Sequence, residues 1–462
     1  MKKNIKYLIT SLFLLLLSMS HVNAKTVYDL DWKTEEIVLE NQHTLFSDYG
    51  IRNVEFNGEY LTTFYADGYS YLISYDIDGN ELNSTRMGQG YILEMIVKDD
   101  YLYIVVEIGE SINLFKYNSS LEFENGIAFD YDDSIALGSM LHSEIPFFAI
   151  NLLSIDDEGN AYLLTVDYDI LAVKSDFSNY EYIPYDEELL NKQFPELAEL
   201  ENYQLDEYYY YNLKKNDKNT VLSGIKPNDC LFTSDECEYD SIGVVTLQDS
   251  EGTELWTKEY TEYKEFINTL LINDYIVTIG IKDLEDLAPC DIVVIDLEGN
   301  IVQTIENENS FYYLVQTTRG IMVANYREEA NGGNDGTSNI DTVTFSTEVY
   351  QFRYDILTKI EGKGNVEVIE SELPGKDITF KVTPEEGYVL EAVKVTDANG
   401  NVITFTDYTF TMPSSDVTIE VTFIKEEKNP ETSDLIIISC LAIIVSGTIL
   451  TYLNIKKRMI TI

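Results

Sequence analysis

The chain has 462 residues, of which 81 are acidic and 31 basic, giving a formal net charge of −50. So negative a surface repels phosphate backbones and anionic lipid head groups, and this excludes nucleic-acid binding as a function. Hydrophobic residues make up 45% of the chain, which excludes general disorder, and the length predicts two or more domains.

The N-terminus has the pattern of an export signal. Lys2, Lys3 and Lys6 precede a short apolar core, and the small residues up to Ala24 suit a signal peptidase. We therefore predict that residues 1–24 form a signal peptide that is cleaved after Ala24. The alternative is an uncleaved N-terminal anchor, although the apolar core is short for a membrane span.

Residues 25–356 contain a β-rich unit that recurs six times. Each unit has two strands around a tight turn, a longer connection, and two more strands around a second tight turn. In the first unit, residues 52–84, the turns are Asn57-Gly58 and Asp78-Gly79-Asn80, and these residues supply the positive φ that tight hairpins need. The other units span residues 91–123, 149–183, 208–259, 265–305 and 311–355.

These four-stranded units resemble the propeller-like repeats of bacterial surface proteins, and their near-regular spacing is typical of propeller blades. The sixth unit lacks a last strand, which the mature N-terminus, Val27–Trp32 or Ile37–Leu39, would supply to close the ring. We therefore predict a mainly β fold with a β-propeller-like domain of six or seven blades. The alternative is a twisted β-sandwich or two smaller β-domains.

One segment, Asp186 to Glu207, departs from the strand pattern. Asp186 is placed to cap a short helix over Glu187–Phe194, and Pro195 is placed to begin a second helix. The segment falls between the third and fourth units. We therefore predict a helical insertion that covers one face of the ring.

Two of the four cysteines, Cys230 and Cys237, flank a short acidic stretch. In an oxidising exterior they would close a local disulfide, which is the interpretation we prefer. Zinc is the alternative, but two thiolates without a nearby histidine do not make a zinc site. Cys290 has no predicted partner and suits a buried position at the start of a strand.

Residues 357–425 form a second predicted domain, which has its own order of turns. Its markers are Gly362-Lys363-Gly364, Pro374-Gly375-Lys376, Pro384-Glu385-Glu386-Gly387-Tyr388 and Asp397-Ala398-Asn399-Gly400-Asn401. That order resembles a bacterial repeat module found near the wall anchor of many surface proteins, which implies a spacer or an interaction module. Alternation with period two predicts a small antiparallel β-domain here.

The C-terminus carries a polar motif, an apolar run and a basic tail in that order. The motif Asn429-Pro430-Glu431-Thr432-Ser433 lies in a linker over residues 426–434, the apolar run covers 435–455 and the tail covers 456–462. The run is long enough to cross a bilayer as a transmembrane helix, and the basic residues behind it favour a cytoplasmic end.

This order resembles the cell-wall sorting signal of Gram-positive surface proteins, in which sortase cuts after the motif threonine and joins it to peptidoglycan. That threonine would be Thr432, while Asn429 and Ser433 depart from the Leu and Gly of the usual Leu-Pro-x-Thr-Gly motif. The resemblance implies sortase and wall peptidoglycan as processing partners. The alternative is a single-span membrane anchor without cleavage, and in both cases the residues before the motif face outward.

No catalytic motif stands out in the exported part. Its two histidines, His43 and His142, lie far apart along the repeat region, and no motif fixes a pair of carboxylates. Asn334–Asp341 offers oxygen ligands but lacks EF-hand spacing, so we interpret it as a polar loop and predict no metal and no cofactor. We expect a surface-anchored protein that binds an extracellular protein or glycan, or has a structural role, without catalysis. The alternative is an extracellular glycan hydrolase or lyase that uses acidic residues.

Overall fold

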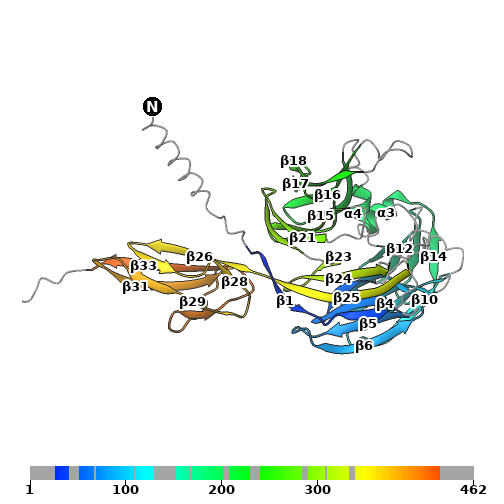
Figure 1. Cartoon of the computed structure of the whole chain (residues 1–462), viewed down its shortest axis with the longest axis horizontal. Helices are drawn as coiled ribbons and strands as arrows, with labels where there is room; N and C mark the ends of the chain where they lie inside the picture. The colour runs from blue at the N-terminus through cyan, green and yellow to red at the C-terminus, as the bar shows by residue number, and fades with distance from the viewer. Residues whose placement is uncertain are drawn as a thin grey trace, which may run out of the picture. The chain divides into compact units, whose positions relative to one another are not determined.

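The computed structural model divides the chain into two compact units, one ending at Phe352 and one beginning at Arg353 (Figure 1). The structure describes residues 26–40, 51–66, 69–108, 111–129, 152–165, 168–200, 208–228, 240–283, 290–306, 310–331 and 339–426.

The described residues of the first unit form six antiparallel sheets, numbered 1 to 6 in chain order. Sheets 1 to 5 are meanders of four consecutive strands. Sheet 1 has β3 (Asn53–Phe56), β4 (Glu59–Ala66), β5 (Tyr69–Tyr75) and β6 (Glu81–Gly88), and sheet 2 has β7 (Tyr91–Lys98), β8 (Tyr101–Ile108), β9 (Ser111–Tyr117) and β10 (Phe123–Ala128). Sheet 3 has β11 (Leu153–Ile155), β12 (Ala161–Leu164), β13 (Ile170–Val173) and β14 (Tyr180–Ile183). Sheet 4 has β15 (Tyr209–Lys215), β16 (Asn219–Pro227), β17 (Ser241–Asp249) and β18 (Glu254–Tyr260), and sheet 5 has β19 (Glu265–Ile272), β20 (Tyr275–Ile281), β21 (Cys290–Asp296) and β22 (Ile301–Ile305).

Sheet 6 is completed by the N-terminus. Its own strands are β23 (Ser310–Gln316), β24 (Gly320–Asn331) and β25 (Asn339–Phe352), and β1 (Tyr28–Lys33) and β2 (Ile37–Glu40) both pair with β25. The prediction that an N-terminal segment closes the ring is confirmed, and both candidate segments take part. The end of the stretch interpreted as a polar loop, Asn334–Asp341, is instead strand, because β25 begins at Asn339 and pairs with β24 and, further on, with β2.

The tight turns show why the chain reverses where it does. In the turn between β5 and β6, a carboxylate oxygen of Asp76 accepts hydrogen bonds from the backbone N–H of Asp78 at 3.0 Å and of Asn80 at 2.8 Å. Gly79 takes the positive φ, +81°, that the turn requires. Hydrogen bonds from the Asn80 side chain and backbone lower the pKa of Asp76. The sequence spacing Asp-x-x-Gly-x repeats this turn at Asp156, Asp249 and Asp296.

Apolar side chains fill the space between successive sheets. Leu61 of sheet 1 packs with Ile92 and Leu102 of sheet 2, and each of these side chains is at most 2% exposed. Similar clusters join sheets 2 and 3, sheets 4 and 5, and sheets 6 and 1. Full burial of one such side chain is worth about 1.5–3 kcal/mol. Strand β19 of sheet 5 also contacts β23 of sheet 6, and sheet 6 packs back onto sheet 1. The fold is mainly β and propeller-like.

Two short helices, α3 (Glu187–Gln193) and α4 (Pro195–Leu200), lie between sheets 3 and 4. As predicted, Asp186 is the N-cap of α3, and its carboxylate accepts from the Leu189 N–H at 3.0 Å. The apolar side of the helices packs on sheet 3, and Glu196 pairs with Lys214 of sheet 4 at 2.6 Å. The insertion therefore bridges two sheets of the ring.

The second unit is a small β-domain. Its strands are β26 (Tyr354–Glu361), β27 (Gly364–Glu367), β28 (Ser371–Glu372), β29 (Asp377–Thr379), β30 (Lys381–Pro384), β31 (Tyr388–Asp397), β32 (Thr409–Thr411) and β33 (Val417–Lys425). The main sheet has the order β28-β26-β33-β31, and two small sheets pair β27 with β30 and β29 with β32.

The prediction of a purely antiparallel domain is wrong, because β26 pairs with β33 in parallel, from Ile356↔Val417 to Glu361↔Thr422. A parallel pair needs a long connection, and all the other strands of the unit lie between these two in sequence. The alternation with period two is real: Val417, Ile419 and Val421 point into the core. The unit also begins with β26, earlier than the predicted start at residue 357.

Candidate functional site

The residues singled out from the sequence lie outside the described part of the chain. They are Ala24, Cys230, Cys237, Asn429, Pro430, Glu431, Thr432 and Ser433, together with His43, His142 and most of the loop Asn334–Asp341. The apolar run at 435–455 is also outside it. Among the described residues, no helix is long and apolar enough to span a membrane, and no group of three or more His, Cys, Asp or Glu is placed to hold a metal ion. Cys290 is described: it begins β21 and is buried, as predicted.

A polar cluster lies where the first strands of several sheets converge; we call Arg52, Asn53, Glu94 and Tyr313 the axial cluster. The Tyr313 hydroxyl on sheet 6 donates to Glu94 Oε1 on sheet 2 at 2.9 Å. Asn53 on sheet 1 donates from Nδ2 to the Tyr313 carbonyl at 3.3 Å. Sheets 6 and 2 are not neighbours, since sheet 1 stands between them. Their contact therefore crosses the middle of the ring.

Arg52 directs its guanidinium into this cluster and is only 8% exposed. Its Nε donates to the Leu93 carbonyl of sheet 2 at 2.8 Å, and its Nη1 donates to the Ile51 carbonyl at 2.7 Å. The guanidinium carbon lies 4.8 Å from the centroid of the Tyr313 ring, within cation–π range. The Arg52 guanidinium, at the start of sheet 1, thus contacts sheets 2 and 6.

Glu94 is the buried acid of the axial cluster, with 4% exposure. Besides Tyr313, it accepts from the Met95 N–H at 3.0 Å through Oε1 and from the Leu152 N–H, which precedes sheet 3, at 3.4 Å through Oε2. Burial raises the pKa of Glu94, and the Arg52 charge and the hydrogen bonds oppose that rise. Burial and the Glu94 charge raise the pKa of Tyr313 well above its ordinary value. The phenol therefore remains a donor, and both carboxylate oxygens are engaged.

Two of these side chains, Glu94 and Tyr313, lie at β-bulges in the first strands of their sheets. The pairing register shifts between Ile92 and Glu94 in β7, and comparable shifts occur in β15, β19 and β23. Tyr313 and Asn268 sit at such shifts with φ of +52° and +51°. A bulge turns a side chain away from the regular alternation, which lets a polar group reach a neighbouring sheet. With its amide oriented to satisfy both partners, Asn268 of sheet 5 pairs with the N–H and carbonyl of Leu314 at 3.0 Å each.

Sequence reasoning missed the axial cluster. The available signal was a polar residue in the first strand of four sheets, namely Asn53 at the start of β3, Glu94 in β7, Asn212 in β15 and Asn268 in β19. What these side chains bond to could not be read from the sequence, since the partners are up to 260 residues away.

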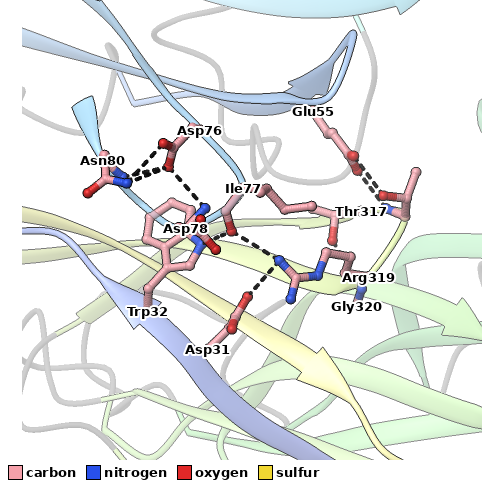
Figure 2. Close-up of polar contacts among 11 residues, drawn as sticks. Asp31, Trp32, Glu55, Asp76, Ile77, Asp78, Asn80, Thr317, Arg319 and Gly320 are labelled. Carbon is pink, nitrogen blue, oxygen red and sulfur yellow. Dashed lines mark hydrogen bonds and ion pairs between the residues drawn. The ribbon is translucent and has the colours of Figure 1, made fainter. Parts of the chain in front are cut away.

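The seam where sheet 6 meets sheet 1 forms a second polar group, shown in Figure 2. Arg319, in the turn between β23 and β24, donates to the Ile77 carbonyl at 3.0 Å and pairs with Asp31 at 3.1 Å. The Trp32 indole N–H donates to the same carbonyl at 3.2 Å. A Cβ on Gly79 would lie 2.6 Å from the Trp32 ring, so the indole packs directly on this turn.

The carboxylates of the axial cluster can be compared with those that a glycan-cleaving enzyme needs. A glycosidase of the common kind needs two carboxylates on either side of a sugar ring. The axial cluster contains one carboxylate, Glu94, and its oxygens accept hydrogen bonds from sheet 2, from sheet 6 and from Leu152, which precedes sheet 3. At Glu94, these hydrogen bonds join sheet 6 to sheet 2.

The fold and its centre define a propeller-like β protein that carries a small β-module after its last sheet. Residues 354–427 match the family described as the divergent InlB B-repeat domain, so the expectation of a bacterial repeat module in this region is confirmed. The match covers the second unit and not the propeller-like unit. A search of curated proteins found no relative that matches the chain.

Solved structures similar to this chain include BamB from Moraxella catarrhalis, at 13% identity and a TM-score of 0.33, over 66% of this chain and 85% of that one. A member of the DUF4221 family from Bacteroides vulgatus matches at 10% identity and a TM-score of 0.32, over 71% of this chain and 99% of that one. YCF48 bound to D1 peptide matches at 9% identity and a TM-score of 0.33, over 69% and 99%. At such scores these likenesses say nothing about ligand or partner.

Proposed function

We propose that the protein is exported, held at the cell surface by its C-terminus, and presents its propeller-like unit for extracellular binding or a structural role without catalysis. The observation that carries the proposal is the order of parts: a propeller-like unit, then a bacterial repeat module at 354–427, then the motif at 429–433 and the apolar run at 435–455. A module that lies between a globular unit and an anchor is in the position of a spacer. The ligand in this proposal is an extracellular protein or glycan.

The hydrogen bonds within the axial cluster support the proposal that the protein is not catalytic. The side chains of Glu94 and Arg52 form hydrogen bonds between sheets. A side chain that already forms two or three hydrogen bonds must break them before it can act on a substrate. The competing function is cleavage of an extracellular glycan by acidic residues. Turnover of any polysaccharide by the purified protein, abolished by substitution of an acidic residue, would establish that alternative.

The anchoring part is tested by Thr432→Ala in a Gram-positive cell that expresses the full chain. In the sorting signals that this motif resembles, the cut comes after the threonine, so loss of the Thr432 side chain should impair recognition and move the variant from the covalently wall-bound fraction to the membrane fraction. Ser433→Gly is the matched variant, because it brings the motif closer to the usual sorting signal and should keep or increase wall attachment. If wild type and Thr432→Ala are both extracted from membranes by detergent alone, the sortase step is refuted and the single-span anchor is retained.

A further inference from the structure

Three aromatic rings gather on the two outer strands of sheet 2. The ring centroid of Phe123, on β10, lies 6.1 Å from that of Phe115 and 6.0 Å from that of Tyr117, both on β9, in edge-to-face arrangements. Phe115 lies against the backbone of β10 at Gly126, where a Cβ would come within 2.6 Å of its ring. Phe123 is 59% exposed, although it contacts two other rings. The outer edge of the sheet therefore holds an exposed phenyl ring in place.

These rings lie on the side of sheet 2 that faces sheet 1. Phe115 and Tyr117 pack against the apolar cluster that joins the two sheets. Phe123 is the direct partner of Tyr117 in the β10–β9 register, so both side chains project from the same face.

Two neutral polar side chains lie on the side of sheet 1 that faces sheet 2. Asn83 and Thr85, on the outermost strand β6, are the register partners of Ser74 and Leu72 on β5. Leu72 belongs to the apolar cluster between the two sheets, so all four side chains face sheet 2. Asn83 Nδ2 donates to Thr85 Oγ1 at 3.2 Å, and both residues are exposed. We call Asn83, Thr85, Phe115, Tyr117 and Phe123 the rim surface.

The hydroxyl of Ser74, beside Asn83, has spare hydrogen-bonding capacity. Ser74 is 3% exposed, and no group in the described part of the chain forms a hydrogen bond with its Oγ. A buried hydroxyl without a partner costs free energy. A ligand hydroxyl that lies against Asn83 is next to this group and would supply the partner, so the chemistry favours a ligand rich in hydroxyls.

The cationic side chains of these outer strands are turned away from the rim surface. Arg86 of β6 lies over the Tyr69 ring at 4.4 Å, and its register partner Tyr71 packs with the cluster that joins sheets 6 and 1. Lys116 of β9 lies over the Tyr101 ring at 3.7 Å, and Tyr101 packs with the cluster that joins sheets 2 and 3. The rim surface itself is uncharged in a chain with a net charge of −50, so charge complementarity selects a neutral ligand.

We propose that the rim surface binds a neutral glycan of β-linked glucose or N-acetylglucosamine units. The substituents of such units are equatorial, so the faces of the sugar ring carry C–H groups and the hydroxyls lie around its edge. A C–H face stacks on Phe123 while edge hydroxyls bond to Asn83 and Thr85, which combines an aromatic surface with a few polar groups. Glu124, next to Phe123 in the chain, disfavours an anionic glycan. The inference rests on the proposed function, because it names the ligand class of the extracellular binding given there.

Calorimetric titration of the purified full chain with cellohexaose and with chitohexaose tests the proposal. We expect at least one of these hexasaccharides to bind at millimolar concentration or below. Phe123→Ala should abolish binding, Phe123→Trp should keep it, and Asn83→Ala should weaken it by about tenfold, the effect of one lost hydrogen bond. Leu255→Ala is the matched control, because Leu255 is an apolar residue on the outermost strand of sheet 4 with 54% exposure, and it should bind like the wild type.

The pattern across the variants decides the outcome. Failure of both hexasaccharides to bind at millimolar concentration overturns the proposal, and so does binding that is unchanged in Phe123→Ala. Binding of hexalysine instead of either sugar, lost in Phe123→Ala, overturns it in favour of a cationic peptide. Asn83→Ala, at an exposed position, gives the answer if Phe123→Ala does not fold. The proposed function is tested separately, because wall fractionation of Thr432→Ala needs no ligand and that function also includes a protein ligand.

Discussion

Tyr313→Phe removes one oxygen atom from the centre of the ring and should lower stability clearly. The Tyr313 hydroxyl is one of the two donors to Oε1 of Glu94, a buried acid that is 4% exposed. A hydrogen bond to a charged group contributes about 1.5–3 kcal/mol, and its loss leaves the carboxylate partly unsatisfied. We expect the free energy of unfolding of the first unit to fall by about that amount.

Tryptophan fluorescence during urea unfolding measures this change selectively. The chain has two tryptophans, and both, Trp32 and Trp256, lie in the first unit. Tyr185→Phe is the matched control, because Tyr185 is 55% exposed and should tolerate the loss of its hydroxyl. If Tyr313→Phe unfolds at the same urea concentration as Tyr185→Phe, the axial cluster does not hold the sheets together and the reasoning is wrong.

Three further changes test other contacts. Gly79→Ala should destabilise the first unit by about 2–4 kcal/mol, since it adds a Cβ at positive φ and against the Trp32 ring. Glu94→Gln should alter how the stability of the first unit depends on pH. Because the pKa of Glu94 is raised in the folded state above its unfolded value of about 4.3, the wild-type protein should lose stability as the pH rises through the folded pKa. Glutamine does not titrate, so the variant should lack this loss. Asp186→Ala should cost about 1 kcal/mol, since the Leu189 N–H loses its cap.

Each of these changes has a direct comparison. Gly58→Ala carries the same φ, +81°, with nothing near its Cβ, so the excess loss in Gly79→Ala measures the Trp32 contact, and equal losses would contradict it. For Glu94→Gln, thermal unfolding across pH is compared with wild type, and parallel curves above pH about 4.3 would show that Glu94 does not titrate differently on folding. For Asp186→Ala, Asp186→Asn should retain most of the cap, and equal losses in the two variants would rule capping out.

Local signals made most of the first unit predictable. Hairpin turns such as Asn57-Gly58 and Asp78-Gly79-Asn80 depend on residues that are adjacent in sequence, so the unit spanning 265–305 was located to the residue. The Asp186 cap is local in the same way. The closing strand was predicted from a topological need, because a sixth sheet with an open edge called for an additional strand.

The features that the sequence did not predict depend on partners that are distant in sequence. The polar start of β25 resembles a loop when read alone, yet it lies in a ladder between β24 and β2, where the backbone pairing outweighs side-chain preference. The parallel pairing of β26 with β33 could not be predicted from alternation with period two. Alternation shows which side chains of a strand face the core, but not whether the strand runs parallel or antiparallel to its neighbour. Glu94 and Tyr313 of the axial cluster lie at bulges in β7 and β23, which a pattern of period two does not reveal.

The pairing of β1 with β25 has a consequence for the order of synthesis. Tyr28 is made near the start of translation and its partner Phe352 only after every other strand of the ring, so the first strand to emerge is the last to be seated. A nascent chain therefore carries an unpaired edge through most of its production, and assembly of the ring is a late, slow event governed by very distant contacts. Any polypeptide truncated before residue 339 would lack the template on which its own beginning must settle.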